Sequence, residues 1–98
     1  MKKEERIILY NKAIEKWGFT SQLDQLIEES GELIVSINKL KRSELDLQDK
    51  REQIFDNFIE ELCDVSMCIE QMKNYYGEEV FNKKFEEKML KFKKQLEK

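Results

Sequence analysis

Residues 26–33 read Leu26-Ile27-Glu28-Glu29-Ser30-Gly31-Glu32-Leu33, and residues 59–65 repeat the plan as Ile59-Glu60-Glu61-Leu62-Cys63-Asp64-Val65. In each stretch an acidic pair follows an apolar residue, and a further acid stands three positions after the pair. Residues three apart on a helix are surface neighbours, so Glu29 adjoins Glu32 and Glu61 adjoins Asp64. Adjacent like charges repel, and a hard divalent cation is their natural counterion. The two stretches therefore predict an acidic cation site on helices.

Both stretches carry an apolar stripe at helical spacing. The stripes consist of Leu23, Leu26, Ile27, Ser30, Leu33, Ile34, Ile37 and Leu40 in the first and Ile54, Phe55, Phe58, Ile59, Leu62, Val65, Ile69 and Met72 in the second. On a wheel of about 100° per residue, each acidic pair is displaced from its stripe in the same rotational sense. Antiparallel packing, stripe against stripe, would place both pairs on one rim, facing outward. We therefore expect another helix or a second subunit to wall the site.

The rest of the chain is typical of one all-α domain over residues 1–98, with no Pro to mark a linker. Apolar periodicity predicts helices at about 4–17, 21–41, 49–75 and 78–97, arranged as an oligomeric four-helix up-and-down bundle. We expect Gly18 and Gly77 to end the first and third helices, and Thr20 or Ser21 to cap the second. Gly31 would allow close approach by a neighbouring helix or by a ligand.

Composition excludes several classes of function. No apolar run is long enough to span a bilayer, and the Lys-Lys-Glu-Glu start does not resemble a signal peptide, so we expect a cytoplasmic protein without a membrane partner. Residues 83–98 hold seven Lys and three Glu, a charge of +4, after a body of −7, and the net charge is −3. This balance makes nucleic acid a poor partner, while the basic tail suits phosphate or simply complements the helix dipole.

The ligand types indicate which metal the acids would hold. The chain contains no His, whereas di-iron bundles use Glu-x-x-His, and oxygen-only ligation favours Mg²⁺ with Mn²⁺ as a substitute. Cys63 and Cys68 match neither a zinc nor a disulfide spacing, and we expect free thiols that are buried or half-buried. A solvated acidic face without a metal is the competing interpretation, since Glu is a strong helix former.

A further set of elements occurs in a fixed order: Lys16-Trp17-Gly18, Gln22-Leu23, the two acidic stretches, and Lys88-Met89-Leu90-Lys91-Phe92. With the acids in the pattern E-x-x-E, 28 residues, E-x-x-D, this order resembles the MazG-like all-α nucleoside triphosphate pyrophosphohydrolases over nearly the whole chain. Cys63 stands where that family commonly has a small residue, and the terminal helix offers Lys where the family often has Arg.

The resemblance implies hydrolysis of a nucleoside triphosphate to a monophosphate and pyrophosphate, with magnesium held by four acids. It implies Glu29, Glu32, Glu61 and Asp64 as metal ligands and catalytic residues. The chemistry of the hydrolysis also calls for an acid that orients or deprotonates the attacking water, for which Glu28 and Glu32 are both candidates. The same resemblance implies two kinds of substrate contact: Lys88 and Lys91 with the phosphates, and Trp17 and Gln22 near the base.

Three functions remain open from the sequence. The first is a magnesium-dependent pyrophosphohydrolase acting on nucleoside triphosphates. The second is a dUTP- or dCTP-specific hydrolase of the same superfamily, and the third is a non-catalytic helical interaction module. A chain this short cannot bury four amphipathic faces alone, so we expect a homodimer or homotetramer in each case.

Overall fold

The computed structural model describes residues 1–43 and 50–98, which form four α-helices and no strand. The helices are α1 (Lys3–Trp17), α2 (Phe19–Ser43), α3 (Arg51–Tyr76) and α4 (Glu78–Leu96). The all-α class is confirmed, and each described helix end lies within two residues of its expected position. The expected connection over 43–48 and the expected start of the third helix at Asp49 fall largely or wholly outside the described residues.

Glycines separate the helices at two of the three junctions. Gly18 and Gly77 have φ of 89° and 98°, in the left-handed range that favours glycine, and they end α1 and α3 as expected. The expected cap of the second helix is wrong, because α2 begins at Phe19, directly after Gly18, and includes both Thr20 and Ser21. The turn at Gly18 therefore starts α2 without a hydroxyl cap.

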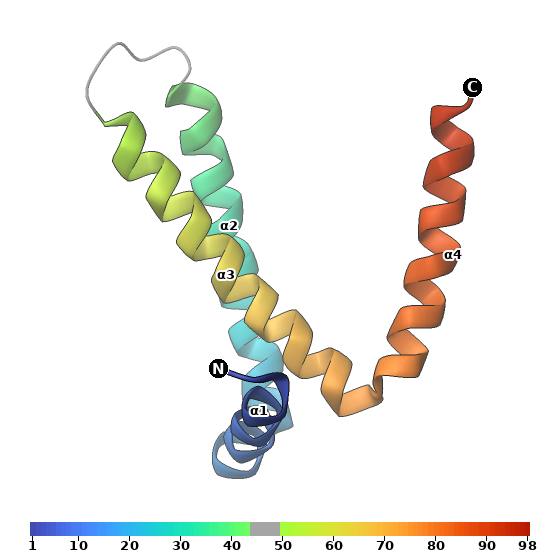
Figure 1. Cartoon of the computed structure of the whole chain (residues 1–98). Coiled ribbons are helices and arrows are strands. Elements are labelled where there is room, and N and C mark those ends of the chain that lie inside the picture. Colours follow the sequence, from blue (N-terminus) through green and yellow to red (C-terminus); the bar gives the residue numbers. More distant parts are fainter. Residues whose placement is uncertain (44–49) are drawn as a thin grey trace.

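The long helices α2 and α3 form an antiparallel hairpin, and α1 packs across one end of it (Figure 1). Helix α4 departs from this group at Gly77, packs only against α3 among the described helices, and touches α1 through an ion pair between Lys3 and Glu78 at its first residue. The packing of a fourth helix against the first three, expected of an up-and-down bundle, is therefore not formed within one chain. No described helix is long and apolar enough to cross a membrane.

The seam between α2 and α3 alternates apolar and polar residues. On α2, the buried and half-buried positions recur at spacings of three and four: Gln22, Leu26, Glu29, Leu33, Ser36, Leu40 and Ser43. The corresponding α3 positions are Ile54, Phe58, Glu61, Val65, Cys68 and Met72. This spacing matches the a and d positions of helices that pack at a shallow angle. Two acids, Glu29 and Glu61, thus occupy seam positions.

The seam is rotated about 50 to 80° from the centres of the apolar stripes, toward the acids. The expectation that the acids face outward is therefore wrong for Glu29 and Glu61, which are half-buried between α2 and α3, while Glu32 is exposed. The rotation leaves part of both stripes exposed on the other side of the hairpin, a surface that we call the apolar flank. It comprises Leu23, Ile27, Ile34, Ile37, Phe55, Ile59, Leu62 and Ile69.

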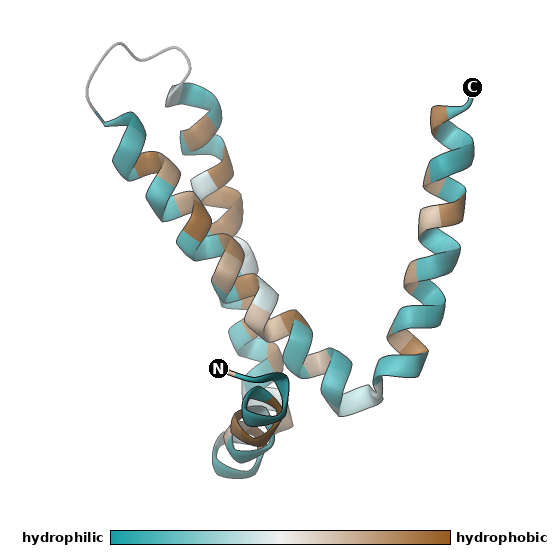
Figure 2. Cartoon of the chain, in the orientation of Figure 1, coloured by the Kyte–Doolittle hydropathy of each residue, from teal (hydrophilic) through white to brown (hydrophobic). Residues whose placement is uncertain are grey.

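Helix α4 is also apolar along one side and is exposed there (Figure 2). Its exposed apolar residues are Val80, Phe85, Met89, Leu90, Phe92 and Leu96. The chain has 8295 Å² of accessible surface, whereas a folded monomer of 11.9 kDa is expected to have about 6,000 Å². The single chain therefore exposes far more surface than a self-contained domain.

A polar clamp ties α1 to α3. The Nε of Arg6 donates to Oε1 of Glu70 at 2.6 Å, and the hydroxyl of Tyr10 donates to the same oxygen at 2.7 Å. These two hydrogen bonds, with Arg6 first, hold the pKa of Glu70 below its ordinary value. Burial and the bond to Glu70 raise the pKa of Tyr10 to about 12. The clamp fixes the end of the hairpin that α1 covers.

We expect Glu70→Gln to lower the free energy of unfolding by about 0.5–1 kcal/mol at pH 7, a modest value because the carboxylate is partly exposed. Because the pKa of Glu70 is lower in the folded chain than in the unfolded chain, its ionised carboxylate stabilises the folded state above the unfolded pKa of about 4.5. This stabilisation is lost as the pH falls through the folded-state pKa. Urea unfolding at pH 7 and at pH 3 measures the difference, with Glu79→Gln as an exposed control. If the natural chain and Glu70→Gln differed in free energy of unfolding by the same amount at both pH values, the clamp would be contradicted.

Candidate functional site

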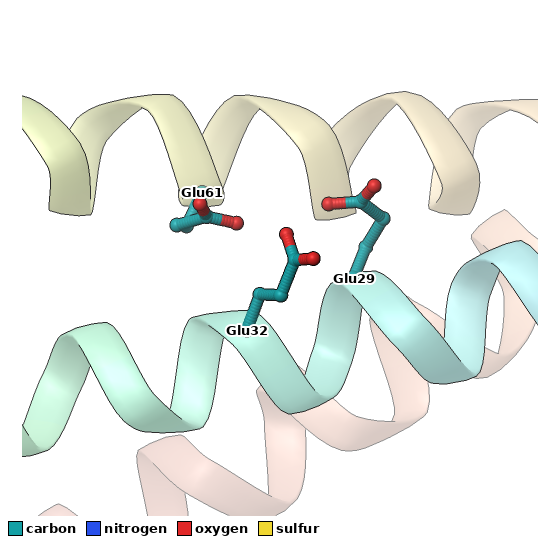
Figure 3. A group of neighbouring side chains, drawn as sticks. All are labelled: Glu29, Glu32 and Glu61. Carbon is teal, nitrogen blue, oxygen red and sulfur yellow. The ribbon is translucent and has the colours of Figure 1, made fainter.

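Three carboxylates meet at the α2–α3 seam, two of them half-buried and the third, Glu32, exposed. Glu29 and Glu32 point from α2 toward α3, and Glu61 points from α3 toward α2 (Figure 3). One carboxylate oxygen from each lies within 4.8 Å of those of the other two. The antiparallel hairpin therefore brings the E-x-x-E pair and the first acid of E-x-x-D together, as the sequence predicts.

We define Glu29, Glu32 and Glu61 as the acidic cluster. Mutual repulsion and burial raise the carboxyl pKa of two of its members. The pKa of Glu32 is raised first by the charge of Glu61 and then by burial. Burial is the larger cause of the raised pKa of Glu29, followed by the charges of Glu32 and Asp64. Both shifts have the direction expected when carboxylates are crowded without a compensating cation.

Two oxygens of the cluster lack hydrogen-bond partners. Oε2 of Glu29 and Oε2 of Glu61 are buried and accept no hydrogen bond from the described residues. Gln25 satisfies the other Glu29 oxygen, donating from Nε2 to Oε1 at 2.7 Å. A buried carboxylate oxygen without a donor is costly, whereas a divalent ion would be coordinated by such oxygens. The donor set and the orphaned oxygens thus fit Mg²⁺ or Mn²⁺.

The remaining predicted acids flank the cluster. Asp64 is half-buried, and its charge acts on Glu29, but its oxygens are not part of the group of three. Glu28 is exposed and lines a hollow together with Glu32 and Glu61. The structure therefore places all five acids in one neighbourhood, with three of them in direct proximity.

A cavity of 620 Å³ opens on one side of the cluster, between α1 and the hairpin. Glu29 and Asp64 line it, together with the two predicted base contacts, Trp17 and Gln22. Pockets of this size commonly hold small-molecule ligands. The packing of α1 thus brings Trp17 next to the acids, while Gln22 lies about two turns before Glu29 on α2 itself.

A smaller hollow of 410 Å³ lies beside the other acids of the cluster. Glu32 and Glu61 line it together with Lys39 and Asn57, a cation and an amide that the sequence patterns did not single out. Gly31 also lines this hollow, and a Cβ at that position would meet no atom within 4 Å. The expectation that Gly31 permits close helix packing is therefore wrong within the chain, while contact with a ligand stays a prediction.

The predicted phosphate contacts lie elsewhere. Lys88 and Lys91 are exposed residues of α4 and line neither cavity. Since α4 packs only against α3 among the described helices and meets α1 only at the Lys3–Glu78 ion pair, one chain does not bring these lysines to the acidic cluster. Their roles stay predictions that depend on how α4 is placed in an assembly.

Sequence reasoning missed several residues that line the larger cavity, notably Tyr10, Met67, Cys68 and Gln71. Cys68 and Gln71 follow Asp64 at helical spacings of four and seven, a signal that could have placed them on the same face. Both cysteines are free thiols as expected, but Cys63 is exposed and only Cys68 is half-buried. Comparisons with protein-family models, curated proteins and solved structures find no match to this chain.

The cluster predicts a specific response to Glu61→Gln. Without divalent ions, removing one of three repelling charges should raise the free energy of unfolding by a few tenths of a kcal/mol at pH 7. Mg²⁺ at about ten times its Kd should stabilise the natural chain by about 1.4 kcal/mol and the variant far less. Urea unfolding with Mg²⁺ and with a chelator measures both effects.

The matched control is Glu60→Gln, which removes the same charge from the exposed neighbouring position. This control should keep the full response to Mg²⁺. Equal stabilisation of the natural chain and Glu61→Gln by Mg²⁺ would show that the cluster does not bind the ion.

Proposed function

We propose that this protein is a magnesium-dependent nucleoside triphosphate pyrophosphohydrolase of the MazG-like all-α type. The observation that carries the proposal is that three carboxylates from α2 and α3 lie close together, and that two of them each have a buried oxygen without a hydrogen-bond donor. A solvated acidic face would not bury carboxylate oxygens in a helix seam without donors. The proposal also accounts for a ligand-sized cavity that shares Glu29 with the cluster.

Each part of the site has a role in this proposal. Glu29, Glu32 and Glu61 hold Mg²⁺, and Asp64 completes the set from the cavity side. When bound, magnesium supplies charge neutralisation for the phosphates and activation of the attacking water. Glu28, at the edge of the smaller hollow, or Glu32, within the cluster, orients that water.

The two hollows suggest a direction for the bound nucleotide. The base would occupy the larger cavity near Trp17 and Gln22, and the phosphates would cross the acidic cluster toward the smaller hollow. Lys39 and Asn57 line that hollow and offer a charge and a donor to the leaving pyrophosphate. Lys88 and Lys91 would add to these contacts if assembly brings an α4 helix to the site.

The proposed reaction predicts a particular product. Nucleoside triphosphates incubated with Mg²⁺ should release pyrophosphate and the monophosphate, which ion-exchange chromatography separates from orthophosphate and diphosphate. Glu61→Gln should reduce turnover at least about a hundredfold, because it removes a metal ligand, and Glu60→Gln should not. Ca²⁺ should support binding with little turnover, because its longer and more flexible coordination positions the reacting groups less well.

The other products separate the competing functions. Release of orthophosphate would assign the protein to a different reaction class. Absence of any magnesium-dependent hydrolysis across the four bases, as ribo- and deoxyribonucleotides, would favour the interaction module. Hydrolysis restricted to dUTP or dCTP would favour the narrower hydrolase.

We also propose that a second copy of the chain covers the apolar flank, as a homodimer or within a homotetramer. The chain exposes about 2,300 Å² more than a folded monomer of its mass, and obligate interfaces bury areas of this order on each partner. The apolar flank and the smaller hollow beside Glu32 lie on opposite sides of the hairpin. An interface at the flank would therefore leave this hollow open.

Sedimentation equilibrium should therefore give a mass at least twice 11.9 kDa at micromolar concentration. Ile34→Glu should shift the protein toward the monomer, because a buried charge in the interface is unfavourable. Ile8→Glu is the matched control, since Ile8 is a similarly exposed isoleucine on α1, outside the flank. A single 11.9 kDa species for the natural chain would remove this proposal.

A further inference from the structure

Two glutamine side chains are buried beside the larger cavity. Gln22 of α2 is 9% exposed and Gln71 of α3 is 4% exposed, which places them among the least exposed residues of the described chain. Both line the larger cavity. Buried amides are uncommon unless hydrogen bonds satisfy them, so their bonding explains what they do.

One end of this amide pair is fully bonded. Nε2 of Gln71 donates to Oε1 of Gln22 at 3.0 Å and to the main-chain carbonyl oxygen of Tyr10 at 3.3 Å. An amide nitrogen has two protons, and these two acceptors use both. The reverse orientation of Gln71 would set its oxygen against two acceptors, so the network fixes which atom of Gln71 points where.

The other end of the pair is not bonded. Over residues 1–43 and 50–98, Nε2 of Gln22 donates no hydrogen bond, and Oε1 of Gln71 accepts none. A purely structural role, joining α1, α2 and α3, explains the donors of Gln71. It leaves a donor and an acceptor that face the open cavity, since neither atom is among the fully buried side-chain atoms of the described residues that lack a partner.

The cavity around the pair suits a flat heterocycle. Its other walls include Tyr10, Met67 and Trp17, which provide aromatic and thioether surface for a ring to contact. Glu29 and Asp64 line the same cavity, so a ring bound against the amides would be adjacent to the acidic cluster. A nucleobase with its sugar directed to the acids satisfies both conditions.

We propose that Gln22 and Gln71 form a recognition site for the hydrogen-bonding edge of the nucleobase. Nε2 of Gln22 donates to a ring nitrogen or carbonyl oxygen of the base, and Oε1 of Gln71 accepts from the neighbouring ring N–H or amino group. The bond between the two amides and the bond to Tyr10 hold the site in place before the ligand arrives. The inference rests on the proposed function for the identity of the ligand and assigns its base specificity to this pair.

Nucleoside binding tests the pair separately from catalysis. Trp17 is the single tryptophan of the chain and lines the cavity, so its fluorescence reports occupancy. We would titrate adenosine, guanosine, cytidine and uridine into the full chain without divalent ions. At least one should give a saturable change by millimolar concentration.

The preferred nucleoside is then compared with its analogue that lacks the donor on that edge. These analogues are purine riboside for adenosine, N1-methylguanosine, pyrimidin-2-one riboside for cytidine and N3-methyluridine. The analogue should bind about tenfold or more weakly, because Oε1 of Gln71 would then lose its partner in a buried site.

Gln22→Glu is the most selective variant. It keeps the side-chain shape and an oxygen that can accept from Gln71, but it replaces the free donor with an oxygen. Nucleoside affinity should fall about tenfold or more, while circular dichroism and the urea midpoint show a folded chain. Gln71→Met should have the same effect on affinity and provides a second test if the buried charge of the first variant disturbs folding.

The control is Asn74→Met. Asn74 of α3 donates to Asn11 of α1 at 3.1 Å, so it is an amide pair between helices that is exposed and does not line the cavity. This variant should bind nucleosides as the natural chain does.

Several outcomes would overturn the inference, and they differ from failure of the proposed function. Equal binding of the nucleoside and its analogue, or equal affinity of Gln22→Glu and the natural chain, would exclude recognition by the pair. Absence of nucleoside binding up to millimolar concentration, with hydrolysis of triphosphates intact, would also exclude it. Specific nucleoside binding that depends on Gln22, without hydrolysis of any triphosphate, would instead retain the recognition site and remove the enzyme.

Discussion

Electrostatic repulsion among Glu29, Glu32 and Glu61, held together by the packing of α2 against α3, is the constraint on which the rest of the structure depends. The seam confines Glu29 between Leu26 and Leu33, and Glu61 between Phe58 and Val65, at helical spacing. The raised pKa values of Glu29 and Glu32, and the orphaned oxygens of Glu29 and Glu61, show an arrangement that is unfavourable without a cation. Packing thus supplies the free energy that keeps these carboxylates close together without a cation.

The polar seam positions also explain the surfaces around the site. Because acids, amides and small hydroxyl residues occupy the seam, the helices leave a cavity on one side of the cluster and a hollow on the other. The same rotation moves the isoleucine-rich half of each stripe out of the hairpin and onto the apolar flank. The polar seam and the exposed apolar flank therefore have the same cause, which is the pair of faces through which α2 and α3 pack.

Much of this arrangement could be predicted from the sequence. Helix ends at Gly18 and Gly77 follow from local conformational preference, and the convergence of the two acidic stretches follows from their shared rotational sense in an antiparallel pair. The helix face could not be predicted, because hydrophobic periodicity finds the centre of a stripe. It does not show that Gln22, Ser36 and Ser43 enter the seam while Ile27 and Ile34 stay exposed.

Two other features depend on long-range contacts that local patterns do not report. The position of α4 is set by the turn at Gly77 and by whatever covers its apolar side, so its periodicity predicts a helix but not its partner. Gln71 was missed because a glutamine inside an amphipathic helix is ordinarily a solvated residue. Only the packing of α1 shows that its amide meets Gln22 and the Tyr10 carbonyl.

The central claim is that the acidic cluster is a divalent-cation site, and anomalous diffraction from crystals grown with Mn²⁺ tests it most directly. The account predicts an anomalous peak between Glu29, Glu32 and Glu61, at about 2.0–2.3 Å from an oxygen of at least two of them. Ordered carboxylates with no peak between them, or a lysine ammonium in that position, would contradict it.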